Sequence, residues 1–217
     1  MVVLLDEGTT ATKDVQAIRS AVVRFISRLG PRAVAISTLS NPPAIVASFE
    51  DDRAAALARL EGAAVNPTAM LAPLEAVSNA VHLIGETGAP FSAIVVVSAR
   101  PIDTSQPAAP GLSQTIFESG AFVSVVVRRA PETAPGRGSS GRADQDLLRD
   151  LSDQTHGQYI TVFSAASYAV ALDRLADRLA TEMMIQYLIP SGAPSTADVR
   201  VGVKAPGARV RGLGASK

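Results

Sequence analysis

The chain has no cysteine among its 217 residues, which excludes disulfide bonds, thiolate metal sites and a cysteine nucleophile. It also lacks an excess of charge of either sign, because 20 lysine and arginine residues balance 20 aspartate and glutamate residues. A protein that binds nucleic acid through the phosphates would carry a basic excess, so we expect no nucleic-acid partner. The longest apolar run, residues 91–97, is much shorter than the roughly 20 residues of a transmembrane helix, so no membrane span is predicted.

Apolar residues make up 47% of the chain, enough for a full core and too many for an intrinsically disordered protein. Short uninterrupted apolar runs are typical of strands buried on both faces, and apolar residues three or four positions apart are typical of helices. Their alternation along the chain predicts a doubly wound, mainly parallel α/β sheet. The predicted strands are 2–5, 33–39, 44–49, 94–97, 122–127 and 159–163, and the predicted helices are 15–29, 51–60, 66–84, 112–118, 144–155 and 168–183.

The end of the chain follows a different pattern. Residues 186–189 and 199–203 alternate between apolar and polar side chains as antiparallel strands do, and residues 208–211 are a third candidate strand. We therefore predict two domains: an α/β domain over residues 1–185 and a small β extension over residues 186–217 that packs on it.

One glycine-rich motif suggests another class of protein. Residues 136–141 satisfy the G-x-G-x-x-G pattern of dinucleotide-binding proteins, which needs its glycines directly between a strand and a helix. Residues 129–135, with two prolines, separate the motif from the nearest predicted strand, which favours a loop. The motif and the pair Arg128-Arg129 leave open a hydrolase or nucleotide-binding enzyme on a generic doubly wound sheet. Neither histidine, His82 or His156, is expected to be catalytic.

Three polar segments are placed where such a sheet binds ligands, at the carboxyl ends of the strands. Residues 6–10 leave the first predicted strand, residues 66–68 open a predicted helix, and residues 98–100 leave the next buried strand. In order and spacing, these segments resemble the three loops of the metal-ion-dependent adhesion site of von Willebrand factor type A domains. The resemblance extends over about residues 1–183 and implies a Rossmann-like, mainly parallel six-stranded sheet flanked by helices.

In that family the first loop reads D-x-S-x-S, the second supplies a threonine and the third an aspartate, and all of them bind Mg²⁺, which prefers oxygen ligands. The resemblance therefore implies Asp6, Thr10 and Thr68 as metal ligands. Gly8 replaces the first serine and Ala99 stands where the third-loop aspartate is expected. The site is thus degenerate, and we expect weak Mg²⁺ binding at most. The alternative is that Asp6 and Thr68 only hold their loops in place.

Family members bind partner proteins at this edge, where a partner carboxylate completes the coordination of the metal. The resemblance implies a non-enzymatic protein-interaction or adhesion module with an unknown protein partner. Residues 180–189, 199–203 and 206–211 resemble the ending of a bacterial von Willebrand A-related group whose members generally look exported, so a periplasmic or extracellular location is expected. A purely structural packing domain of a larger exported protein is a further alternative. The predicted partner surface consists of Glu7, Gly8, Thr9, Asn66, Ser98 and Arg100.

Overall fold

The computed structural model describes residues 1–6, 8, 12–66, 68–89, 91–102, 111–128, 147–183, 203–204 and 206–207. The chain divides into two compact units, residues 1–181 and 182–217. The elements below all belong to the first unit. The glycine-rich motif at 136–141 and nearly all of the predicted β extension lie outside the described residues, so the division at residue 185 stays a prediction.

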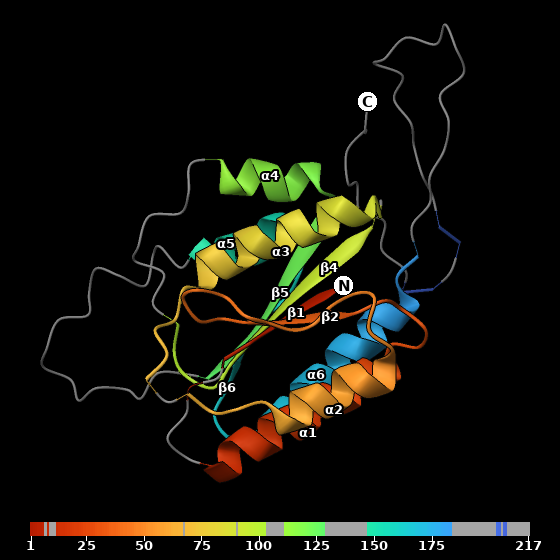
Figure 1. Ribbon diagram of the computed structural model, residues 1–217. Helices are drawn as coiled ribbons and strands as arrows, with labels where there is room; N and C mark the ends of the chain where they lie inside the picture. The colour runs from red at the N-terminus through yellow and green to blue at the C-terminus, as the bar shows by residue number, and fades with distance from the viewer. Residues whose placement is uncertain are drawn as a thin grey trace, which may run out of the picture. The chain divides into compact units, whose positions relative to one another are not determined.

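The first unit is built on a six-stranded sheet with the strand order β3-β2-β1-β4-β5-β6. All neighbouring strands are parallel except β2 and β3 (Figure 1). Leu5 is aligned with Thr38 of β2 on one side and with Val97 of β4 on the other, so these strands end at a common edge. This arrangement confirms the predicted α/β fold. The strands are β1 (Val2–Leu5), β2 (Ala35–Thr38), β3 (Ile45–Ala47), β4 (Ser92–Ser98), β5 (Ala121–Arg128) and β6 (Tyr159–Val162).

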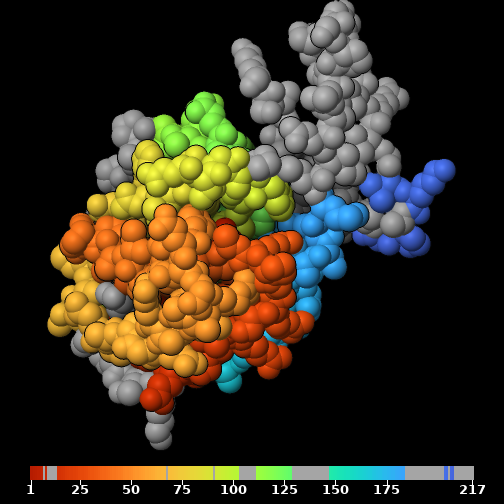
Figure 2. All heavy atoms as spheres, turned by 45° about the vertical axis from the view of Figure 1, so that its right-hand side comes forward, coloured from red at the N-terminus to blue at the C-terminus, as the bar shows by residue number. Residues whose placement is uncertain are grey.

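The described residues form six helices, which cover the sheet in two layers (Figure 1). Helices α1, α2 and α6 pack on one face, and α3, α4 and α5 pack on the other. In the space-filling view, the surface of β3 and α2, in orange, lies next to that of α3, in yellow (Figure 2). The helices are α1 (Thr12–Arg28), α2 (Arg53–Gly62), α3 (Pro73–Thr87), α4 (Leu112–Glu118), α5 (Leu147–Gln154) and α6 (Ala165–Thr181).

The central strand β1 shows why an uninterrupted apolar run in the sequence predicts a buried strand. All four of its residues are buried, with Val3 and Leu5 in the core beneath α1 and α6, and Val2 and Leu4 in the core beneath α3. A strand that is covered on both faces needs apolar side chains at every position.

None of the helices in the described part of the chain is both long enough and apolar enough to cross a membrane.

One predicted helix start is wrong. The Asn66-Pro67 pair indicated a helix from residue 66, but α3 begins at Pro73. The preceding residues instead form hydrogen bonds with the loop after β2, because Asn41 N donates to the Met70 carbonyl at 3.1 Å and Ala72 N donates to the Leu39 carbonyl at 2.8 Å. Met70 was predicted to lie on the apolar stripe of this helix, yet its side chain is 71% exposed in the loop.

Candidate functional site

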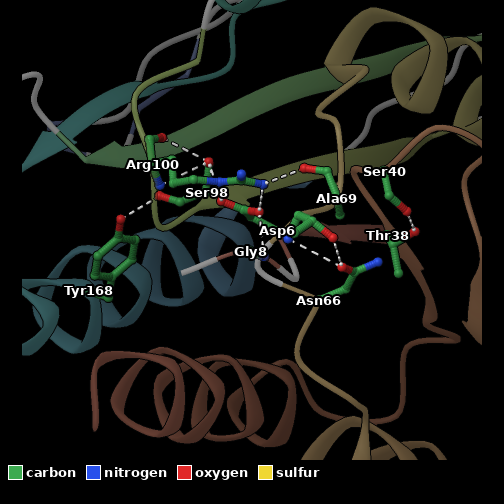
Figure 3. A network of polar contacts seen from close by, with 10 residues as sticks. Asp6, Gly8, Thr38, Ser40, Asn66, Ala69, Ser98, Arg100 and Tyr168 are labelled. Carbon is green, nitrogen blue, oxygen red and sulfur yellow. Dashed lines mark hydrogen bonds and ion pairs between the residues drawn. The ribbon is translucent and has the colours of Figure 1, made fainter. Parts of the chain in front are cut away.

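The carboxyl ends of β1 and β4 bring together two of the three predicted segments. Asp6 N donates to the carbonyl of Val97 at 3.0 Å, which continues the pairing of the two strands by one residue. Ser98 is the last residue of β4, and the chain then turns at Ala99 and Arg100. Because the two strands end side by side, the side chains of Asp6, Ser98 and Arg100 meet at this edge (Figure 3).

The carboxylate of Asp6 is the centre of the site. Its side chain is fully buried, whereas that of Arg100 is 30% exposed. Arg100 donates from Nη2 to Oδ1 at 2.8 Å and from Nε to Oδ2 at 3.1 Å, which is a bidentate ion pair. Gly8 N donates to Oδ1 at 2.8 Å, and Ser98 Oγ lies 3.1 Å from Oδ2, sharing its one proton between this oxygen and the Arg100 carbonyl at 2.8 Å. Such charge-assisted bonds are stronger and more specific than neutral ones, so this carboxylate is both neutralised and fixed.

The guanidinium of Arg100 also reaches the loop before α3. Its Nη2 donates to the carbonyl of Ala69 at 3.2 Å, so one side chain links the ends of β1 and β4 to this loop (Figure 3). The neighbouring residue Thr68 turns elsewhere, because its hydroxyl donates to Asn66 Oδ1 at 2.9 Å and its backbone N donates to the same atom at 3.2 Å. The three segments therefore meet through Arg100.

Gly8 leaves the space that the guanidinium fills. A Cβ atom at this position would lie 2.3 Å from Arg100 Nη2 and 2.5 Å from its Cζ. The φ angle of Gly8 is outside the left-handed region, so the backbone itself would accept a side chain. Glycine is therefore needed for Arg100 to hold this position, because a side chain at residue 8 would displace the guanidinium.

A second ion pair and a buried tyrosine complete the edge. Arg128, at the end of β5, binds Asp14 of α1 with Nη1 2.8 Å from Oδ2. Tyr168 of α6 is fully buried and donates its hydroxyl to the carbonyl of Ser98. Burial raises the pKa of Tyr168 well above its ordinary value, and the nearby carboxylates of Asp6 and Asp14 raise it further, against an opposing effect of Arg128.

Replacing Tyr168 with phenylalanine is expected to lower the free energy of unfolding by about 1–2 kcal/mol at neutral pH, because the Ser98 carbonyl loses its buried donor. Since the folded state raises the pKa of this phenol, the stabilisation is complete below the ordinary tyrosine pKa of about 10 and is lost as the pH rises above it. Urea denaturation of wild type and Y168F should give a stability difference that is constant between about pH 8 and pH 9 and shrinks by about 1 kcal/mol by about pH 11. A difference that stays the same up to about pH 11 would contradict this assignment.

The structure sorts the predicted site residues into three groups. Glu7, Thr9 and Thr10 lie outside the described residues. The predicted ligand Asp6 is buried, and so are Gly8 and Ser98, which were predicted to face a partner. The exposed or partly exposed members are Asn66, Thr68 and Arg100.

Sequence reasoning missed the pairing of Arg100 with Asp6 and the contributions of Tyr168, Arg128 and Asp14. The available signal was the combination of Gly8, Ala99 and Arg100. Glycine and alanine stand where the family pattern has a serine and an aspartate, and an arginine directly follows the alanine. The contacts of Tyr168, Arg128 and Asp14 join residues far apart in the sequence, and no local motif marks them.

A divalent cation does not fit the described residues as they stand. They provide two carboxylates at this edge, Asp6 and Asp14, and each is already paired with an arginine. Ala99 offers no side-chain ligand, and the Thr68 hydroxyl is directed to Asn66. Within the part of the chain that the structure describes, no three His, Cys, Asp or Glu side chains gather to hold a metal. Mg²⁺ needs hard oxygen ligands in near-octahedral geometry, and this set does not supply them.

Comparison of the sequence with protein-family models and with curated proteins finds no match. Comparison of the structure with solved structures finds similar folds. BatB from Bacteroides thetaiotaomicron superposes with a TM-score of 0.60 at 17% identity, over 83% of this chain and 98% of that one. A von Willebrand factor type A structure from Catenulispora acidiphila has a TM-score of 0.62 at 14% identity, over 82% of this chain and 42% of that one.

A third similar structure is proximal thread matrix protein 1 from the mussel byssus. It was solved with a zinc-occupied MIDAS motif, the abbreviation for the metal-ion-dependent adhesion site. It has a TM-score of 0.62 at 9% identity, over 82% of this chain and 47% of that one. This chain thus spans less than half the length of the second and third proteins. At these identities the likenesses establish a common fold.

Proposed function

We propose that this chain, which has the von Willebrand factor type A fold that its sequence predicted, is a non-enzymatic interaction module that binds a partner protein at the carboxyl edge of its sheet. Such domains include the neighbour with a zinc-occupied MIDAS motif, which is an adhesion-type site. The resemblance of the tail to an exported bacterial group supports a periplasmic or extracellular location as part of the same proposal. The observation that carries the proposal is a group of exposed apolar residues in the loop after β2 and the loop before α3, the second of which Arg100 contacts at Ala69.

The patch is formed by two loops that meet at this edge. Met70 is 71% exposed in the loop before α3, and Ile45 is 60% exposed at the start of β3, opposite Ser37 of β2. Pro42 and Ala44, in the loop between β2 and β3, are also exposed. We call Pro42, Ala44, Ile45 and Met70 the edge patch. Large apolar side chains that gather on a surface are typical of protein-interaction sites, where methionine is enriched.

The edge patch is held in place before any partner binds. Asn41 N donates to the Met70 carbonyl at 3.1 Å, and Thr38 N donates to the Ala44 carbonyl at 2.9 Å. Thr38 Oγ1 accepts from Ala44 N at 2.8 Å and shares a hydrogen bond with Ser40 Oγ at 2.7 Å. A preorganised surface loses little conformational freedom on binding, which favours recognition of a folded partner.

The chemistry of the edge supports binding over catalysis. Its described carboxylates, Asp6 and Asp14, are each paired with an arginine. The two histidines lie elsewhere: His82 is exposed on α3, and His156 precedes β6, at the end of the strands opposite to the edge patch. A general acid or base needs a free titratable group within reach of a substrate, and this arrangement favours none of these residues for that role.

The double variant M70E/I45E tests the proposal. We expect it to retain less than about one tenth of a partner protein that co-purifies with the tagged wild-type chain from extracts of the source cells, a loss of about 1.4 kcal/mol or more of binding free energy. The matched control is V170E, which changes a side chain that is 53% exposed on α6. Quantitative mass spectrometry compares the three captures, and thermal melts confirm that each variant is folded. Equal capture by all three chains would contradict the proposal.

A further inference from the structure

We propose that the guanidinium of Arg100 is a built-in substitute for the divalent cation at Asp6, so that the edge is assembled without Mg²⁺, and that Gly8 is the residue that admits it. This inference goes beyond the proposed function, because it concerns the ion chemistry of the free chain and holds whether or not a partner binds at the edge patch.

The contacts of Asp6 leave no room for a second cation. A carboxylate has about four lone-pair positions. In this structure Arg100 Nη2, Arg100 Nε, Gly8 N and Ser98 Oγ approach them at 2.8 to 3.1 Å. A metal ion could reach the carboxylate only if the guanidinium left. The guanidinium also binds the Ala69 carbonyl, so it joins separate loops as a shared metal ion would.

The charges at the edge also favour Arg100 over a divalent cation as the partner of Asp6. Asp6 and Arg100 sum to zero, whereas a divalent cation on the same single carboxylate would leave one positive charge. Asp14 and Arg128 form a second neutral pair. Among the described residues, the edge therefore presents paired charges beside an apolar patch, and contacts made there should depend little on chelators.

Gly8 and Arg100 depend on each other. A Cβ atom at residue 8 would lie 2.3 Å from Nη2, 2.5 Å from Cζ and 2.9 Å from Nη1 of Arg100. Non-bonded atoms do not approach so closely, and the guanidinium, at the end of a flexible side chain, is the group that would move. A serine at position 8 and the observed guanidinium position are therefore incompatible. G8S would displace the guanidinium of Arg100 and add an oxygen ligand beside Asp6.

The first test uses the wild-type chain. Its melting temperature should be the same in EDTA, in millimolar Mg²⁺ and in millimolar Mn²⁺. In NMR spectra, the Arg100 Nε–H signal, assigned by its absence from R100A, should be slow to exchange and unchanged by either ion. A saturable rise of the melting temperature that EDTA reverses would overturn the proposal.

The second test converts the site. G8S/R100A removes the guanidinium and adds a hydroxyl, so we expect Mn²⁺ to raise its melting temperature by about 5 °C at a hundredfold excess over its Kd. The control D6N/G8S/R100A lacks the carboxylate and should show no shift. Absence of the shift in folded G8S/R100A would overturn the claim that Arg100 stands in the place of the cation.

A third comparison isolates Gly8. G8A adds a methyl group without an oxygen ligand, and both G8A and G8S should lose the protected Arg100 Nε–H signal. Retention of that signal in both variants would overturn the role given to Gly8. Because every readout concerns the free chain, these tests can fail while M70E/I45E still abolishes partner capture, so failure of this proposal and failure of the proposed function are distinguishable.

Discussion

Replacing Arg100 with alanine is expected to lower the free energy of unfolding by about 3 kcal/mol at pH 7, because it leaves the fully buried carboxylate of Asp6 without its cation. Breaking a buried ion pair by removing one partner commonly costs about 3–5 kcal/mol. We place the effect at the lower end because the Arg100 side chain is 30% exposed and because Asp6 keeps its bonds from Gly8 N and Ser98 Oγ. Urea denaturation followed by circular dichroism measures the change.

Two controls test whether the cost of R100A is specific to the Asp6–Arg100 pair or follows from removing any ion-paired arginine. R24A breaks an exposed ion pair with Asp173 of similar length, 2.7 Å, in which Arg24 is 61% exposed, and it should cost less than about 1 kcal/mol. D6N/R100A removes both charges and should be more stable than the sum of the single changes predicts, with a coupling of about 1 kcal/mol or more. A cost for R100A no larger than that for R24A would contradict the central role of the Asp6–Arg100 pair.

The fold was predictable because burial leaves a direct record in the sequence. Each residue of β1 is apolar since the strand is covered on both faces, and β4 and β5 show the same continuous pattern over Ala93–Val97 and Ala121–Val127, with Ser124 the only polar residue. Helical spacing in α1 and α6 reflects the one face that each turns to the sheet. These are local signals, and they required no knowledge of which strands pair.

The site was predictable only in part, because its key contacts are not local. The position of Asp6 after β1 follows from topology, and the structure places it at the expected edge. Its partner Arg100 is 94 positions away, and the direction of a long flexible side chain is not recorded in the residues around it. The Asn66-Pro67 pair misled for a related reason: hydrogen bonds to the loop after β2 took priority over the local helix signal.

Gly157 follows α5, and its contacts with β5 require glycine at this position. The left-handed residue after α5 is His156, with a φ of 60°, so Gly157 is not needed for that conformation. Instead its α-carbon passes directly over β5: a Cβ atom here would lie 1.7 Å from the Val123 carbonyl oxygen and 2.5 Å from its carbon. The chain around this contact is fixed by Gly157 N donating to the Ser152 carbonyl and Val125 N donating to the Gln158 carbonyl, both at 2.7 Å.

We therefore expect G157A to lower the free energy of unfolding by about 3–4 kcal/mol, because the added methyl group must push apart two backbone segments that have no flexible side chain to yield. The matched control is G85A. Gly85 lies exposed within α3, where a Cβ atom would meet nothing within 4 Å, so the same substitution should stabilise the chain by about 0.5–1 kcal/mol. Urea denaturation of both variants measures the two effects. Opposite signs would show that the close approach to β5 requires glycine at position 157, whereas equal effects would contradict it.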